Sequence, residues 1–218
     1  MLAERDGALV QTGRVDGLGE GERIYAVRYF GDLATVVTFR QTDPLYVLDL
    51  ADPAAPQLLG ELKVPGFSNY LHPVGEDRLL GIGSSADAQG RVTGLQAQLF
   101  DLSDRTRPRS TDVLRLSGRD AWTPVADDSR AFAYDADRRL ALLPVGSWDG
   151  GGSSNAAVGV RVSADGSLRE VGRLSVVGGE SVQRVLTRDG VVYAVTALGI
   201  VAGRADTLAR TGVVAFPG

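Results

Sequence analysis

Two places in the chain hold side chains that could take part in chemistry, and each lies beside a short apolar run. His72 is the only histidine among 218 residues, and it stands at the end of a strand-like segment. Arg40, Gln41 and Asp43 crowd a connection between two such segments. An imidazole can act as a general base when an acid lies within hydrogen-bond reach. Polar side chains gathered on a loop can recognise a carboxylate or a sugar. Arg40, Gln41, Asp43 and His72 are therefore the candidate ligand-binding residues.

A structural role is the simpler interpretation of both places. Asp43-Pro44 is a turn pair, because proline presets the turn dihedral and aspartate bonds its own backbone. The ring of His72 could bond a carbonyl in a central channel, and Asp43 is its best candidate acid by position in the repeat. One histidine in a chain without cysteine cannot form a histidine-rich or thiolate metal site. The sequence predicts no metal, no cofactor and no catalytic residue.

Other chemical signatures are missing as well. The nucleophile pattern Gly-x-Ser-x-Gly does not occur. The glycine-rich stretch at 150–154 lacks the Lys-Ser/Thr end of a phosphate-binding loop. The acidic stretch at 135–139 lacks the oxygen spacing of a calcium loop. The sequence thus favours a protein that is not an enzyme.

Composition narrows the choice of partners. The net charge of −4 and the acidic balance argue against a nucleic-acid partner, because phosphate binding needs a clustered positive field. The longest apolar run is too short to span a bilayer. The first residues carry no basic segment followed by an apolar one, so no signal peptide is expected in this sequence. A protein, a small molecule or a carbohydrate remains as the expected partner.

Short β-branched and aromatic runs, separated by Gly, Asp and Pro, recur along the whole chain and predict strands. The first four lie at 24–30, 34–39, 45–50 and 58–64. Four strands in about forty-five residues match the length of one propeller blade. The second run of a unit is the most apolar, as at Leu79-Leu80, which predicts sheets covered on both faces. Helix is expected to be nearly absent.

Two pairs of segments repeat the same residue pattern, which indicates a repeat architecture. Residues 6–15 match 165–174, and residues 49–56 match 101–108. We therefore predict an all-β fold, a β-propeller segment of about four four-stranded antiparallel blades, in a single domain over 1–218. The predicted blades lie at about 22–67, 68–118, 119–178 and 179–217.

Residues 6–15 match an outermost strand, but no inner strands come before them in the sequence. We expect an orphan outer strand there, as in a propeller cut in the middle of a blade. Four blades standing open would expose two large apolar faces, which soluble monomers avoid. Missing upstream blades or self-association is therefore expected.

The residues over 21–83 carry a family likeness, most clearly Leu45-Tyr46-Val47-Leu48-Asp49-Leu50 and Gly60-Glu61-Leu62-Lys63-Val64-Pro65-Gly66. They resemble bacterial and archaeal secreted proteins with a C-terminal β-propeller that is distantly related to Trp-Asp (WD-40-like) repeat propellers. The Asp-Pro-x-x-Pro turn at 52–56 also resembles the LVIVD-type propeller repeat. The resemblance implies an extracytoplasmic location and no established reaction.

Together these observations predict a non-enzymatic binding or scaffold module of an extracytoplasmic β-propeller protein. The alternative is an enzyme with a site at the channel mouth, acting on cell-wall or polysaccharide material. An enzyme should gather several convergent charged side chains with perturbed titration around the axis.

Overall fold

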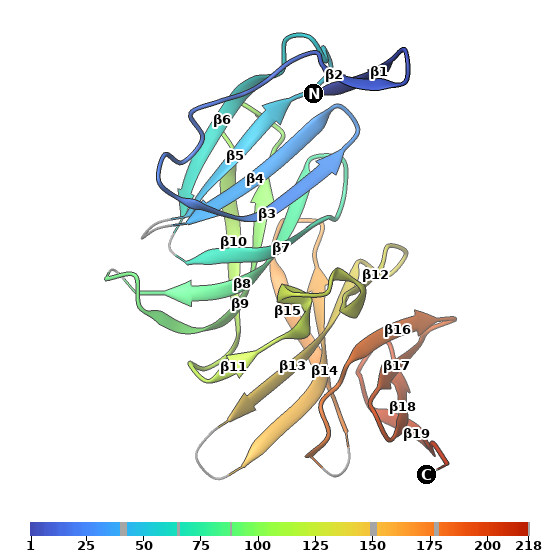
Figure 1. Ribbon diagram of the computed structural model, residues 1–218. Coiled ribbons are helices and arrows are strands. Elements are labelled where there is room, and N and C mark those ends of the chain that lie inside the picture. Colours follow the sequence, from blue (N-terminus) through green and yellow to red (C-terminus); the bar gives the residue numbers. More distant parts are fainter. Residues whose placement is uncertain (40–42, 65, 88, 149–151, 177–178, 218) are drawn as a thin grey trace.

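The computed structural model describes residues 1–39, 43–64, 66–87, 89–148, 152–176 and 179–217, and it consists of strands arranged in a fan of sheets (Figure 1). The first sheet contains β3 (Arg23–Phe30), β4 (Leu33–Phe39), β5 (Asp43–Asp49) and β6 (Gln57–Val64) in that order. The second contains β7 (Phe67–Pro73), β8 (Arg78–Ala86), β9 (Val92–Asp101) and β10 (Arg109–Ser117). The fourth contains β16 (Arg184–Arg188), β17 (Val191–Val195), β18 (Gly199–Arg204) and β19 (Arg210–Ala215). Neighbouring strands within each sheet pair antiparallel.

The third sheet departs from the four-strand pattern because its first strand is divided. Both β11 (Ala121–Trp122) and β12 (Ala133–Asp135) pair with β13 (Leu140–Trp148), which continues to β14 (Ser153–Val162) and β15 (Leu168–Ser175). Two short 3-10 helices, η1 (Pro124–Ala126) and η2 (Ser129–Ala131), lie between the two pieces. Their first turns are capped by the side chains of Thr123 and Asp128, and Pro124 has no N–H for a strand ladder. The predicted all-β fold of four-stranded antiparallel blades is otherwise confirmed.

The first strands of successive sheets lie next to one another at the inner side of the fan. β3 contacts β7, and β12 contacts β16. Three apolar clusters fill the spaces between sheets, and adjacent residues of one strand contribute to different clusters. Leu79 packs toward the first sheet and Leu80 toward the third. Leu142 likewise packs toward the fourth sheet and Leu143 toward the second. The inner sheets are therefore covered on both faces, which explains their continuous apolar runs.

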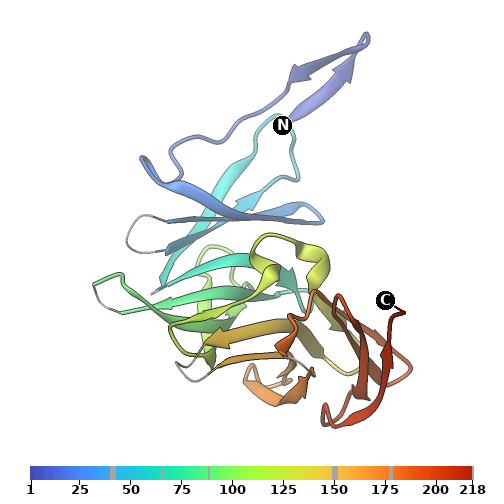
Figure 2. The ribbon, with the colours of Figure 1, turned by 60° about the horizontal axis from the view of Figure 1, so that its bottom comes forward.

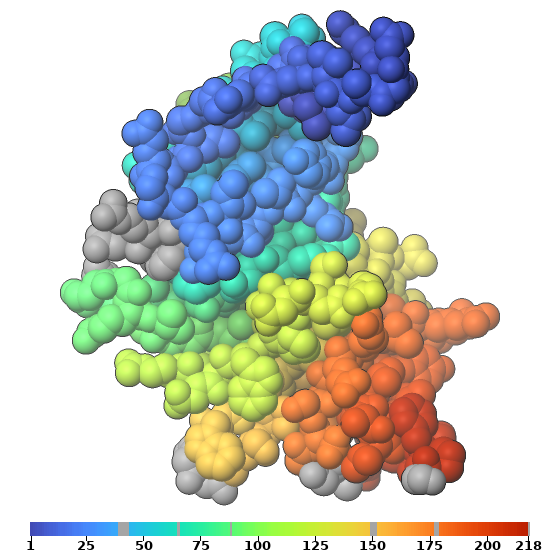
Figure 3. All heavy atoms as spheres, viewed as in Figure 1, coloured from blue at the N-terminus to red at the C-terminus, as the bar shows by residue number. Residues whose placement is uncertain are grey.

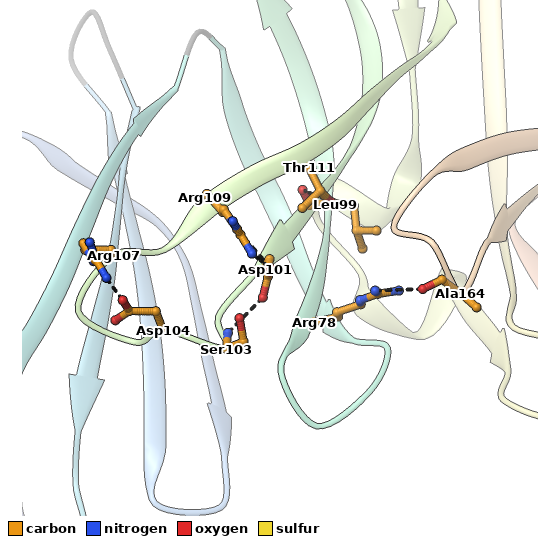
Figure 4. A network of polar contacts seen from close by, with 9 residues as sticks. All are labelled: Arg78, Leu99, Asp101, Ser103, Asp104, Arg107, Arg109, Thr111 and Ala164. Carbon is orange, nitrogen blue, oxygen red and sulfur yellow. Dashed lines mark hydrogen bonds and ion pairs between the residues drawn. The ribbon is translucent and has the colours of Figure 1, made fainter.

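The two turns whose sequences match, at 49–56 and 101–108, are stabilised by equivalent hydrogen bonds. Asp49 accepts a hydrogen bond from the backbone N–H of Ala51 at 2.9 Å, and Asp101 accepts one from Ser103 at 2.9 Å. Asp101 also forms an ion pair with Arg109 at 2.7 Å (Figure 4). Hydrogen bonds from the hydroxyl and N–H of Ser103, together with Arg109, lower the pKa of Asp101 to about 2. Each turn holds the third and fourth strands of its sheet together.

Polar contacts also link neighbouring sheets. The guanidinium of Arg78 donates to the carbonyl of Ala164 at 2.9 Å (Figure 4) and to that of Ser163 at 3.0 Å. These bonds join β8 to the turn between β14 and β15. The backbone N–H of Leu168 donates to Asp112 at 2.6 Å. These bonds lie at the rim of the apolar cluster between the second and third sheets.

Residues 6–15, for which an orphan outer strand is predicted, are strand only in part. Only β2 (Ala8–Gln11) is strand, and it pairs with β1 (Leu2–Arg5) in a hairpin that stands away from the sheets (Figure 2). Asp6 and Gly7, the two turn residues, have φ of 54° and 78°. Two consecutive positive φ values are typical of a type I′ turn, for which Asp-Gly is a preferred pair.

Candidate functional site

Of the four predicted site residues, only His72 has a side chain that the structure describes. Arg40 and Gln41 lie outside the described residues. Asp43 begins β5, where its backbone pairs with Val64, and its side chain is likewise outside the described part. His72 lies on β7, the inner strand of the second sheet, opposite Leu80 of β8. Only His72 can therefore be placed in a site.

An aromatic cluster surrounds His72. Its ring centroid lies 4.8 Å from that of Phe132 and 5.3 Å from that of Tyr134. Nδ1 of His72 lies 3.1 Å from the hydroxyl of Tyr70. Tyr70 and His72 are two residues apart on one strand, so their side chains project to the same side of β7. Phe132, which directly follows η2, and Tyr134 of β12 complete the cluster from the third sheet.

Burial determines the protonation state of this cluster. The pKa of His72 is lowered to about 4, first by burial and then by the charge of Arg28. Burial raises the pKa of the Tyr70 hydroxyl, and Arg28 opposes that rise. At neutral pH the imidazole is neutral and the phenol is protonated. A neutral imidazole has one donor and one acceptor nitrogen, so one ring nitrogen bonds Tyr70 and the other remains for a second partner.

Arg28 brings a positive charge to the same place. Its guanidinium carbon lies 5.8 Å from the centre of the Tyr70 ring, within cation–π range. Arg28 comes from β3 and Tyr70 from β7, so the contact joins the inner strands of two neighbouring sheets. Among the described residues no carboxylate lies within ion-pair distance of Arg28, whereas Arg109 and Arg138 are both paired.

A cavity of about 270 Å³ opens beside Arg28 and Tyr70. Its lining residues are Tyr25, Ala26, Val27, Arg28, Asn69, Tyr70, Leu71 and Ser129. A larger hollow of about 730 Å³ lies at the turns of the second and third sheets, and Tyr134 and Arg139 are among its lining residues. The His72 cluster lies between the two, since Tyr70 lines the first and Tyr134 lines the second. We name the smaller one the axial cavity.

Within the described part of the chain, no group of three or more His, Cys, Asp or Glu side chains could hold a metal ion. No helix in that part is long and apolar enough to cross a membrane.

Reasoning from the sequence missed Arg28, Tyr70, Phe132 and Tyr134. An alignment of blade against blade could have found the first two, because both lie on first strands of consecutive units. Phe132 and Tyr134 lie in a run at 131–134 that the sequence predicts as the second strand of its unit, whereas in the structure β12 forms part of the divided first strand.

The comparisons with known proteins agree with this architecture. The family model described as "Beta propeller domain" matches residues 1–208, so the chain belongs to that family. An uncharacterized protein of Methanocaldococcus jannaschii is 43% identical over 139 residues, which cover 64% of this chain and 21% of that protein. An uncharacterized protein of Archaeoglobus fulgidus is 43% identical over 141 residues, which cover 65% of this chain and 22% of that protein. The aligned part is thus about a fifth of the length of these relatives.

The single histidine allows a direct test of the cluster. We expect His72 to titrate near pH 4, well below its ordinary value of about 6.5. Burial of the neutral ring makes its full contribution to the free energy of unfolding above pH about 6.5. This contribution declines as the pH falls toward 4, because only the imidazole of the unfolded chain takes up a proton in that range. Proton NMR of the one imidazole gives the titration without assignment. A midpoint at or above pH 6 would show that the ring is solvated, contrary to the structure.

Proposed function

We propose that this protein is a non-enzymatic binding module and that the axial cavity receives a small ligand carrying a carboxylate. The observation that carries the proposal is the placement of Arg28, a cation on the cavity wall with no carboxylate partner among the described residues. A guanidinium recognises a carboxylate through two parallel hydrogen bonds. The ring of Tyr70 restrains Arg28 from one side, so less side-chain entropy is lost on binding.

The size and polarity of the cavity support a small ligand. At about 270 Å³ it lies just below the range of roughly 300–1,000 Å³ that is typical of ligand pockets. The Asn69 amide and the Ser129 hydroxyl on its wall can donate and accept hydrogen bonds. Ala26, Val27 and Leu71 supply apolar wall. This mixture suits a short aliphatic chain that ends in a carboxylate.

The chemistry of His72 supports binding over catalysis. A general base works best when its pKa lies near the operating pH. A pKa of about 4 makes His72 a weak base at neutral pH. Its described neighbours are two tyrosines and a phenylalanine. An enzyme acting on cell-wall or polysaccharide material would need an acid beside this ring.

Location and wider relationships are part of the same proposal. We place the protein outside the cytoplasm, as a scaffold or binding module related to Trp-Asp and LVIVD-type propellers. The support is the sequence likeness over residues 21–83 and the repeated turn that begins at Asp49 and Asp101.

Replacing Arg28 with glutamine should abolish most carboxylate binding while leaving the fold intact. Losing one charge-assisted hydrogen-bonding partner weakens binding by about 1.5–3 kcal/mol, roughly ten- to a hundredfold in Kd. Glutarate is a suitable probe and its neutral diamide the matched ligand, with calorimetry and the His72 resonance as readouts.

Arg23→Gln is the matched control protein. Arg23 lies over the ring of Tyr25 at 5.7 Å on the same strand, but it does not line the axial cavity. Glutarate should bind this variant as it binds the unmodified protein. Equal binding of glutarate and its diamide, or unchanged glutarate binding by Arg28→Gln, would contradict the proposal.

A further inference from the structure

The segment after β2 packs against the first sheet. The fourth strand of the first sheet packs against the second sheet in the same way. A Cβ atom added at Gly60 of β6 would lie 2.5 Å from the carbonyl oxygen of Arg105 and 2.8 Å from Cδ of Pro108. A Cβ added at Gly13 would lie 2.5 Å from Cδ of Pro56, the equivalent proline of the preceding unit. Outer strands thus pack closely against the third-to-fourth-strand turn of the following sheet. By this contact, β1 and β2 hold the position of the outer half of a further blade.

On the same side of the first sheet, the inner strand β3 is not covered by any described strand. Ile24, Val27 and Tyr29 of β3 are 61%, 41% and 69% exposed. Ala34 and Val36, the cross-strand partners of Tyr29 and Val27 on β4, are 1% and 6% exposed. Val15 and Leu18 pack against the cluster that contains Ala34 and Val36. The N-terminal segment therefore covers the outer part of this face and leaves the inner strand bare (Figure 3).

β7, the inner strand of the second sheet, is equivalent to β3 and is packed on both sides. On β7, Leu71 is buried toward the first sheet and Tyr70 toward the third. On β3, Ala26 and Phe30 pack toward the second sheet, while the opposite side faces solvent. An apolar hollow of about 180 Å³, lined in part by Met1, Val27 and Tyr29, lies between the bare strand and the hairpin.

The free edge of β1 limits what can occupy this place. β1 pairs with β2 on one side only, so its other edge can accept a further strand by backbone hydrogen bonds. A complete four-stranded sheet, such as β16–β19 of a second copy, does not fit, because β1 and β2 already hold the outer positions. Two strands fit, one paired with β1 and the next covering β3.

We propose that an antiparallel pair of β-strands of the same kind as β7–β8 completes this half-blade, pairs with the free edge of β1 and buries Ile24, Val27 and Tyr29. The occupant needs apolar residues at alternate positions on the face that meets β3. The Tyr70, Leu80 and Ile82 face of β7–β8, which packs against the third sheet, has this character. The matched relatives are several times longer than the aligned part, so proteins of this kind have chain available for two more strands.

The experiment uses the whole chain with a copy of its own residues 67–91 joined before Met1. This segment contains an inner strand pair and the connection that leads to a third strand, so it has the connectivity the site requires. Because the chain has no cysteine, Tyr29→Cys gives one labelling site on the bare face. Val113→Cys on β10, where Val113 is 50% exposed, is the matched site away from it.

In the extended protein, thiol labelling at position 29 should slow about tenfold or more relative to the unextended protein, with no change at position 113. The amides of β1 should also gain protection from hydrogen exchange. A second extension, with aspartate at the copied positions of Leu80 and Ile82, should give neither effect.

Unprotected labelling at position 29 in the extended protein would overturn the proposal. So would protection of that position in the unextended protein by self-association, seen as a concentration-dependent mass in sedimentation. The latter result would assign the face to a second copy.

Discussion

Replacing Gly60 with alanine should lower the free energy of unfolding by about 2–3 kcal/mol, as expected for overpacking against rigid backbone. The new methyl group would lie 2.5 Å from the carbonyl oxygen of Arg105 and 2.8 Å from Cδ of Pro108. Both atoms belong to a turn that Asp104 holds through a hydrogen bond from the N–H of Thr106 at 3.1 Å. The turn cannot yield without separating the first sheet from the second, so the strain falls on the interface.

Gly212→Ala is the matched control for this prediction. Gly212 also lies in the fourth strand of a sheet, and a Cβ there would meet nothing within 4 Å. Its replacement should change stability by no more than about 0.5 kcal/mol. Urea unfolding followed by fluorescence measures both variants. Equal effects at the two positions would mean that the sheets are not packed through this turn.

Leu79→Ala and Leu80→Ala should each cost about 2–5 kcal/mol, although the two residues are neighbours on one strand. Both side chains are fully buried, Leu79 among residues of the first and second sheets and Leu80 among residues of the second and third. Neighbouring residues of a strand point to opposite faces. A large loss of unfolding free energy at both positions is therefore expected only if both faces of β8 are covered.

Leu186→Ala provides the comparison. Leu186 lies on β16 of the last sheet and is 54% exposed. Its truncation should cost less than about 1 kcal/mol, because little apolar area returns to water on unfolding. Thermal and urea unfolding of the three variants measure these losses of stability. A loss below about 1 kcal/mol for either Leu79→Ala or Leu80→Ala would place β8 in a sheet with one solvated face.

Local features of the sequence were enough to predict most of the fold. Strand length, the apolar pair Leu79-Leu80 and the repeated turns at 49–56 and 101–108 all act over a few residues. Steric and hydrogen-bonding preferences at that range do not depend on the rest of the chain. The family match over residues 1–208 and the antiparallel sheets agree with that prediction.

The candidate site was predicted only in part. His72 was found because it is the only residue of its kind, but its neighbours come from other sheets. Arg28 reaches Tyr70 from β3, and Phe132 and Tyr134 approach His72 from the third sheet. No spacing along the chain encodes such contacts, since they arise from the stacking of one sheet on another.

The sequence alone determined the repeating unit, the strand order within it and the covering of middle strands on both faces. These follow from residue periodicity and turn chemistry, which are properties of short segments. The tertiary structure decided that Arg28 lies beside a neutral His72, and that β1 and β2 leave Tyr29 exposed. Burial and charge proximity depend on which surfaces meet in space, so only the assembled sheets could establish them.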